Sequence, residues 1–243
     1  MPLSVLKPFS VWCDMLMKVN NAYIEEVLGR AAARLAGKGL LKPGDVLSQR
    51  IPEQNAFVSV RINSGQDVPD EFEWTSLSAT PGLTATPGLS AIPGDLHHRI
   101  YRARPDVGAI ASGGLTWTSA LARLDLSLPA VFDEQIRHLG LEAKRLGMCS
   151  TDDPTKALSN GANAYCLDDM ALCFGMGLER LLLNIEILEK CAECFILAQS
   201  ATVKVKQIPW LIRFIANGRL KKDQKEAAAR HLRGERSIMK AGY

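Results

Sequence analysis

The sequence predicts a single α/β domain, because helix patterns and short apolar strands follow one another along a chain without a linker. The clearest unit starts with a helical pattern over residues 95–104, which ends before Pro105 because the residue preceding a proline is pushed out of the helical region. Residues 107–111 form a short apolar run that enters a Ser-Gly-Gly turn, a pattern typical of a buried strand. The 243 residues are enough to bury one sizeable core.

Further elements lie on both sides of this unit. Residues 15–41 and 178–203 carry apolar side chains near a period of 3.6, which predicts two long amphipathic helices. A short helix is predicted over residues 115–124. Residues 55–61 predict a strand, and residues 164–174 predict two strands joined by a tight Asp-Asp turn.

The composition excludes several classes of protein. Of the residues, 47% are hydrophobic and 23% are charged, and no apolar run approaches the roughly 20 residues of a membrane span. The start of the chain is interrupted by Pro8 and Asp14 and lacks a cleavage site, so we expect an ordinary first segment rather than a leader. The six cysteines are too few for a dense disulfide framework. They predict free thiols and a cytoplasmic protein without a membrane partner.

The charge is unevenly distributed. Residues 204–243 hold eleven Lys and Arg against three Asp and Glu, a net charge of +8, which leaves −5 for residues 1–203 of the overall +3. We therefore predict a main unit at residues 1–203 and a basic helical extension of the same domain at residues 204–243, with a helix over 221–239. A solvated helix face is the expected role of this extension, and nucleic acid is not an expected partner.

Three motifs connect the sequence with a known family. They are Val-Ser-Val-Arg at residues 58–61, Tyr-Arg-Ala-Arg-Pro-Asp-Val at 101–107 and Leu-Pro-Ala at 128–130. Over roughly residues 19–203 the sequence resembles the class II aldolase/adducin family, which includes sugar-phosphate aldolases, pentulose-phosphate 4-epimerases and the non-catalytic adducin head. The resemblance implies a three-layer α/β domain with a mainly antiparallel central sheet flanked by helices. It also implies a homo-oligomer, commonly a tetramer, with sites between subunits.

The resemblance locates the family's metal site, and the metal-binding residues are missing there. In catalytic members the central strand ends in a His-x-His pair that holds zinc or another divalent metal. The matching positions here are Ser112 and Gly114. The third ligand histidine matches Asp169, and the catalytic glutamate matches Pro93. We therefore predict no metal and no other cofactor.

Any remaining chemistry would need other groups. Asp133, Glu134 and His138 follow the Leu-Pro-Ala motif, in the region where the aldolases supply acid/base groups to the cleft between subunits. A carboxylate and an imidazole can exchange protons near neutrality, so these three are the candidate catalytic residues. The alternative is a solvated turn in which Arg137 contacts a carboxylate.

Substrate-binding candidates are the positions at or near the family cleft. The family's phosphate-contacting Gly-Asn pair matches Ala56 and Phe57, so a bulky apolar ring replaces a phosphate donor. The remaining candidates are Ser59, Ser112, Gly113, Gly114 and Asp169.

Residues 79–94 contain three tandem Pro-Gly pairs, which cannot lie inside a regular helix or central strand. They predict a surface loop built from turns. The alternative is a Pro-rich loop that binds a partner.

Two functions follow from this pattern. The first is a non-catalytic or diverged family member that keeps the oligomeric scaffold as a binding or structural module, as the adducin head does. The second is an aldehyde-lyase or epimerase that acts on a small hydroxy-carbonyl compound or sugar phosphate with a rearranged site, carried by the three candidate catalytic residues and by Asp168 or Asp169. A protein partner or a catalytic paralogue would fit the first, because the family's clefts lie between subunits.

Overall fold

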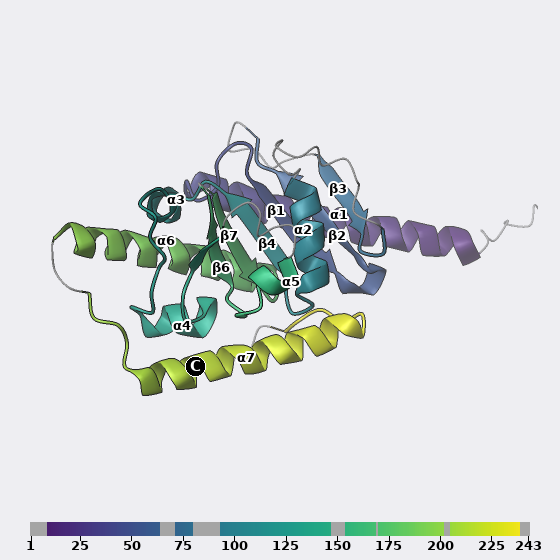
Figure 1. Cartoon of the computed structure of the whole chain (residues 1–243). Coiled ribbons are helices and arrows are strands. Elements are labelled where there is room, and N and C mark those ends of the chain that lie inside the picture. The colour runs from purple at the N-terminus through teal and green to yellow at the C-terminus, as the bar shows by residue number, and fades with distance from the viewer. Residues whose placement is uncertain are drawn as a thin grey trace, which may run out of the picture.

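The computed structural model describes residues 9–63, 71–79, 93–146, 154–168, 170–201 and 205–238. They form one seven-stranded sheet with helices on both faces (Figure 1). In chain order the elements are α1 (Phe9–Gly37), β1 (Val46–Ile51), the short 3₁₀ helix η1 (Pro52–Gln54), β2 (Ala56–Arg61), β3 (Phe72–Ser76), α2 (Pro93–Ala103), β4 (Ala109–Gly113), α3 (Thr116–Arg123), α4 (Asp133–Leu139), β5 (Lys144–Leu146), α5 (Pro154–Ala157), β6 (Ala164–Leu167), β7 (Met170–Gly175), α6 (Leu178–Ser200) and α7 (Trp210–Leu232).

The strands lie in the order β3-β2-β1-β4-β7-β6-β5. All neighbouring pairs are antiparallel except β5 and β6, so the predicted α/β class with a mainly antiparallel sheet is confirmed. Antiparallel pairing brings the last residues of β4 beside the first residues of β1 and β7. We call this the Gly113 end of the sheet. The opposite end, where β4 begins and β7 finishes, is the Gly175 end.

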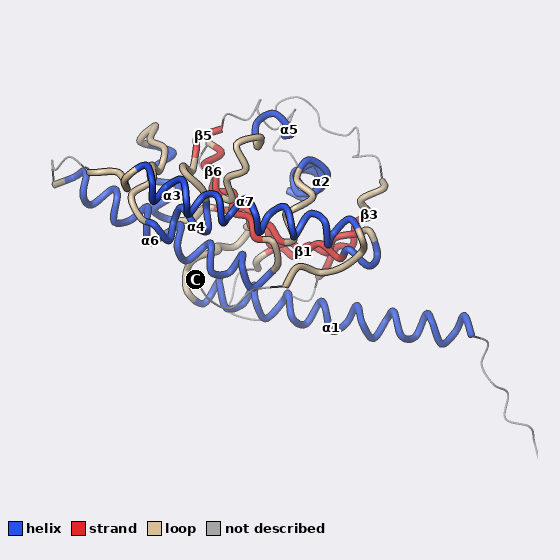
Figure 2. Tube along the Cα trace, turned by 90° about the horizontal axis from the view of Figure 1, so that it is seen from below, coloured by secondary structure: helices blue, strands red, loops and turns tan. Residues whose placement is uncertain are grey.

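Side chains alternate between two cores along each strand, because successive residues of a strand point to opposite faces. On β4, Ala109 and Ala111 belong to the core shared with α1, α3 and α6, whereas Ile110 belongs to the core under α2. Figure 2 shows α1 and α2 on opposite sides of the strands. The sheet is therefore covered on both faces, as the three-layer prediction requires.

Helix α7 runs along the Gly175 end of the sheet and packs against α4 (Figure 1). Its inner side chains Leu220 and Ala227 form a small apolar cluster with Met176, which follows β7. Near its C-terminus, His231 Nδ1 donates to the carbonyl oxygen of Pro105 at 2.8 Å. A helix is thus present in the basic tail, but it spans Trp210–Leu232 rather than the predicted residues 221–239.

Several local predictions differ from the structure. Strand β1 was not predicted, because its polar residues 48–50 interrupt the apolar pattern, and it lies between β2 and β4. The Leu-Pro-Ala motif at residues 128–130 lies outside the named strands. Leu128 forms an isolated bridge with Ala143, and Pro129 has no N–H with which to extend a ladder. Residues 133–139 form the helix α4 rather than a turn.

Four cysteines are free thiols, namely Cys166, Cys173 and Cys191, which are buried, and Cys194, which is exposed. The prediction of free thiols is confirmed for these four. Among the described residues, no helix combines the length and the apolar character that crossing a membrane requires. Residues 80–92, which hold two of the three Pro-Gly pairs, lie outside the described residues. The third pair, at residues 93–94, forms the start of α2 rather than part of the predicted loop, because a proline is tolerated in the first turn of a helix.

Candidate functional site

The Gly113 end of the sheet is where the resemblance locates the family's site. Ser112 and Gly113 are the last residues of β4, and Pro93 is the first residue of α2. The turn between β6 and β7 lies at the same end, because Gly113 pairs with Ala171 at the start of β7. Several of the predicted site residues are therefore gathered at one end of the sheet.

A buried network of hydrogen bonds joins α2 to two strands there. The ring of His97 is fully buried, with Nδ1 2.8 Å from Ser48 Oγ on β1 and Nε2 2.9 Å from Ser112 Oγ on β4. Ser48 Oγ also lies 2.9 Å from the hydroxyl of Tyr101, one turn further along α2. Both ring nitrogens of His97 thus have partners, and so does the hydroxyl of Ser112.

This network keeps the imidazole of His97 neutral. Burial lowers its pKa from 6.5 to about 3, since the charged ring would lose its hydration. A neutral imidazole donates with one nitrogen and accepts with the other, and the two hydroxyls can meet both needs. His97 is therefore a satisfied core histidine that joins α2 to the sheet.

A second polar contact fixes the turn after β4. The carboxylate of Asp45 accepts from the backbone N–H of Lys42 at 2.8 Å and from that of Gly114 at 3.1 Å. A Cβ atom at Gly113 would lie only 2.2 Å from Cγ of Asp45, so this close approach requires glycine. Gly113 and Gly114 therefore serve as partners of Asp45, with no side chain to offer a ligand.

The remaining substrate-binding candidates lie around this network. Ser59 on β2 is buried and pairs directly with Ser48 on β1. Phe57, two residues earlier on β2, packs against Tyr101 with ring centroids 5.1 Å apart and fills the core under α2. Asp168 has a left-handed backbone (φ 50°) in the predicted turn between β6 and β7. Asp169 lies outside the described residues.

The candidate catalytic residues lie on α4, at the Gly175 end. Asp133 Oδ1 accepts from the N–H of Glu134 at 2.9 Å in the first turn. Nη1 of Arg180 donates to Nδ1 of His138 at 2.5 Å. Burial, together with the charges of Arg180 and Arg137, lowers the pKa of His138 to about 4. At neutral pH His138 is thus an uncharged acceptor that already has a donor.

The structure does not bring the two groups of candidates together within one chain. The carbonyl oxygen of His138 accepts from Asn163, which directly precedes β6 at the Gly175 end. Ser112 and Gly113 lie at the other end of the sheet. Any joint action of the two groups would therefore need a second chain.

The side chains at the Gly113 end do not fit the family's metal ion. A catalytic zinc takes three protein ligands through nitrogen, sulfur or carboxylate oxygen. Here one assigned position holds Ser112, whose hydroxyl is bonded to His97, and another holds Gly114, which has no side chain. In the described ranges, no three His, Cys, Asp or Glu side chains gather closely enough to hold a metal.

Sequence reasoning missed three residues of this site. Ser48 belongs to the strand that was not predicted, Tyr101 lies within a motif that was used only to recognise the fold, and Asp45 lies in a loop. The sequence does contain one signal for strand β1, the alternation of Leu47 and Ser48. This alternation places a hydroxyl on one face of a strand whose other face is apolar.

Comparisons with known proteins agree with this architecture. No protein-family model matches the sequence, and no curated protein matches it. Among solved structures, an L-fuculose 1-phosphate aldolase has a TM-score of 0.66 at 18% identity, covering 81% of this chain and 95% of that one. L-fuculose 1-phosphate aldolase from Glaciozyma antarctica PI12 has a TM-score of 0.65 at 17% identity, covering 98% and 97%.

An aldolase II superfamily protein from Pseudomonas syringae also matches, with a TM-score of 0.59 at 17% identity, covering 88% of this chain and 96% of that one. The chain is thus an α/β protein with the class II aldolase fold. Identities of 17–18% show the fold alone, so the activity must be argued from this chain's own residues.

Proposed function

We propose that the chain is a class II aldolase-like scaffold that has lost the family's metal-dependent chemistry and acts as a binding or structural subunit. Cleavage of an aldol bond generates an enolate, which the family stabilises with a Lewis-acidic metal. The positions assigned to the metal ligands hold Ser112, Gly114 and Asp169, and the position of the base holds Pro93.

The observation that carries this proposal is the bonding of His97. It is the buried histidine beside the strand end where the family holds its metal, and both of its ring nitrogens face hydroxyl groups of the sheet. A metal ion at this histidine would have to replace one of these hydrogen bonds and leave a buried hydroxyl without its partner. That replacement costs about 1–3 kcal/mol.

The test is the metal content of the purified, untagged protein after dialysis against trace zinc, manganese and cobalt, measured by plasma mass spectrometry. We expect far less than one ion per chain, and no cleavage of L-fuculose 1-phosphate. A matched variant, His97→Ala, should leave this low value unchanged. About one ion per chain, lost in His97→Ala, would contradict the proposal.

The same samples address the alternative of a lyase or epimerase with a rearranged site. Cleavage or epimerisation of a sugar phosphate that disappears in Asp133→Asn or His138→Gln would identify α4 as the catalytic element. Such activity without bound metal would show that the chain is an enzyme and not a scaffold. We expect no such activity.

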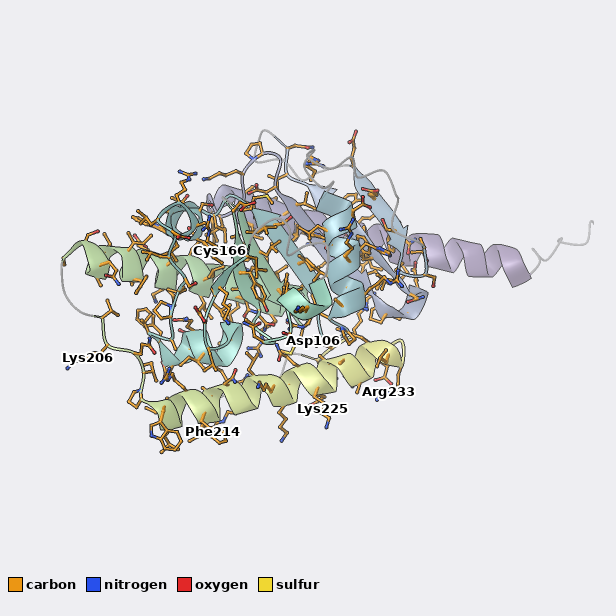
Figure 3. All side chains as sticks on the ribbon, in the orientation of Figure 1. Asp106, Cys166, Lys206, Phe214, Lys225 and Arg233 are labelled. Atoms are coloured by element: carbon orange, nitrogen blue, oxygen red, sulfur yellow. The ribbon has the colours of Figure 1, made fainter. Side chains whose placement is uncertain are left out.

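We also propose that the chain forms a homo-oligomer through the first turns of α7. The apolar segment of α7, residues 210–215, exposes 70% of Trp210 and 72% of Phe214, together with Leu211, Ile212 and Ile215. Figure 3 shows Phe214 pointing away from the sheet. Apolar side chains gathered in this way mark an interaction surface.

The four free thiols support a reducing compartment, and we propose the cytoplasm.

The charges of the chain favour a second copy of itself as the occupant of this surface. Residues 204–243 carry a net charge of +8 and residues 1–203 carry −5. The basic extension of one copy therefore complements the acidic remainder of another.

A further inference from the structure

A pocket of about 300 Å³ lies at the Gly175 end of the sheet, away from the network around His97. Its walls come from the end of β1, the first turn of α6 and the inner side of α7. A pocket of this size is at the small end of the range for ligand sites, so it suits a small molecule rather than a nucleotide. The lining residues that matter most are Gln49, Arg50, Gly177, Arg180, Arg230 and His231.

Two guanidinium groups in this wall lack a carboxylate partner. Arg180 is only 8% exposed, and its Nη1 donates to the neutral ring of His138. Arg50 donates to the carbonyl oxygens of Val107 and Tyr101. Among the described residues, no carboxylate oxygen lies within 4.0 Å of either guanidinium.

The two carboxylates that attract these arginines, Asp223 for Arg180 and Asp106 for Arg50, form their ion pairs with other arginines. Asp223 lines the pocket, but its carboxylate pairs with Arg137 at 2.6 Å. Asp106 pairs with Arg104 at 2.7 Å. A buried cation without a counter-ion is costly, and an anion that enters the pocket would remove that cost.

The backbone adds N–H donors to the same wall. Helix α6 starts after Gly177, which supplies no side-chain cap, and residues 177–180 line the pocket. The first N–H groups of a helix have no partner inside it and carry the positive end of the helix dipole. They therefore reinforce the two arginines.

The wall also contains an acceptor. Oε1 of Gln49 is buried, and the described residues give it no hydrogen-bond partner. Glu179 lines the pocket as well, and it is exposed to solvent. An anion without an O–H or N–H group would leave Oε1 of Gln49 unmet, whereas a molecule with a hydroxyl or amino group would satisfy it.

We propose that this pocket binds a small organic anion, a carboxylate or a phosphate monoester, that also carries a hydroxyl or amino donor. The anionic group faces Arg180, Arg50 and the first turn of α6, and the donor faces Gln49. The site goes beyond the proposed scaffold function, since it lies at the other end of the sheet and uses none of the residues at the Gly113 end.

Isothermal titration calorimetry on the full chain tests the proposal, in buffer with EDTA so that metal binding does not contribute. Matched probes separate the chemistry, with glycerol 3-phosphate against propyl phosphate and malate against succinate. We expect the hydroxyl-bearing member of at least one pair to bind about tenfold more tightly, the value of one hydrogen bond to a buried acceptor. Binding of the phosphate pair would identify a phosphate as the anionic group of the ligand, and binding of the malate and succinate pair would identify a carboxylate.

Two arginines of α7 provide a matched pair of variants. Both pair with Glu235, Arg230 at 3.4 Å and Arg233 at 3.1 Å, but only Arg230 lines the pocket. Figure 3 shows Arg233 at the end of α7. Arg230→Glu should weaken binding at least about tenfold, because it places a negative charge at the anion's entrance. Arg233→Glu should change it less than about twofold, because exposed charges contribute little.

One more variant completes the test. Arg180→Gln should abolish measurable binding, with circular dichroism confirming that the variant is folded. The proposal is overturned if no probe binds at a concentration of about 10 mM, beyond the weakest useful affinity. Equal losses in Arg230→Glu and Arg233→Glu would overturn it too, because the anion would then bind the charged surface rather than the pocket.

Discussion

At the scale of single residues, His97 explains how the sheet and α2 are held together at the Gly113 end. Its ring spans two strands that neighbour each other, through Ser48 on β1 and Ser112 on β4. A hydrophobic residue could fill the same volume, but it would remove the partner of the Ser112 hydroxyl and leave the Ser48 hydroxyl with Tyr101 alone. The histidine is thus a structural connector whose contribution depends on its remaining neutral.

His97 should make the protein less stable in acid. The unfolded chain protonates this histidine below pH 6.5, whereas the folded chain keeps it neutral down to about pH 3. Stability is therefore lost as the pH falls below 6.5, and at pH 5 the loss from this residue is about 2 kcal/mol. We expect urea unfolding at pH 7 and pH 5 to show a smaller fall in His97→Gln than in the wild type, by about that amount.

The comparison works although His97→Gln is itself less stable, since only the change between the two pH values is read. The other three histidines remain in both proteins and cancel. An equal fall in wild type and variant would mean that the ring is accessible to protons, contrary to its burial.

Sequence reasoning reached part of this network. Ser112 and Gly114 could be located because they follow a recognisable strand. The bond to Ser48 joins residues 49 positions apart, across a strand whose polar pattern hid it. Which hydroxyl faces which ring depends on strand pairing, and no local pattern contains that information.

At the scale of elements, one carboxylate holds a helix that lacks a cap of its own. Helix α3 begins after Leu115, which offers no side-chain oxygen to its first N–H groups. Glu189 on α6 takes that role, because its oxygens accept from the N–H of Trp117 at 2.9 Å and from the N–H and hydroxyl of Thr118 at 2.8 and 2.7 Å. A negative charge at this helix terminus is also favoured by the dipole.

Removing this cap should destabilise the fold. Glu189→Ala leaves three donors without an acceptor in a largely buried place, so we expect a loss of about 2–3 kcal/mol in the free energy of unfolding. Glu189→Gln keeps an acceptor oxygen and should lose about half as much. Urea unfolding followed by circular dichroism measures both.

The control is Glu193→Ala, one turn further along α6 on a more exposed side chain. We expect a change within about 0.5 kcal/mol, as for most surface substitutions. Equal losses at both positions would attribute the effect to α6 itself rather than to the contact with α3. The apolar face of α6 was predictable from its period, but the carboxylate within that face becomes meaningful only when α3 is placed beside it.

At the scale of the whole molecule, the fold class was predictable, but the placement of several elements was not. The recurrence of apolar side chains in the long helices and the motif at residues 101–107 led to the correct architecture. Strands β1 and β3 and the course of α7 could not be predicted, because polar residues in β1 and the position of a tail helix depend on what they pack against. The same holds for the pocket at the Gly175 end, whose walls come from distant parts of the chain.

The apolar segment of α7 predicts how copies of the chain assemble. Trp210 and Phe214 are mostly exposed, and burying aromatic side chains is worth about 2 kcal/mol each at the centre of an interface. The double variant Trp210→Ser with Phe214→Ser should therefore weaken self-association by at least about 100-fold, measured by sedimentation velocity over a range of concentrations.

The control is Leu232→Ser, at the other end of α7, where Leu232 is 79% exposed. This variant should assemble as the wild type does. Because we propose that the basic extension of one copy meets the acidic remainder of another, raising the salt concentration should also weaken assembly. A wild-type monomer at every concentration would contradict the oligomer, and assembly unchanged in the double variant would move the interface away from α7.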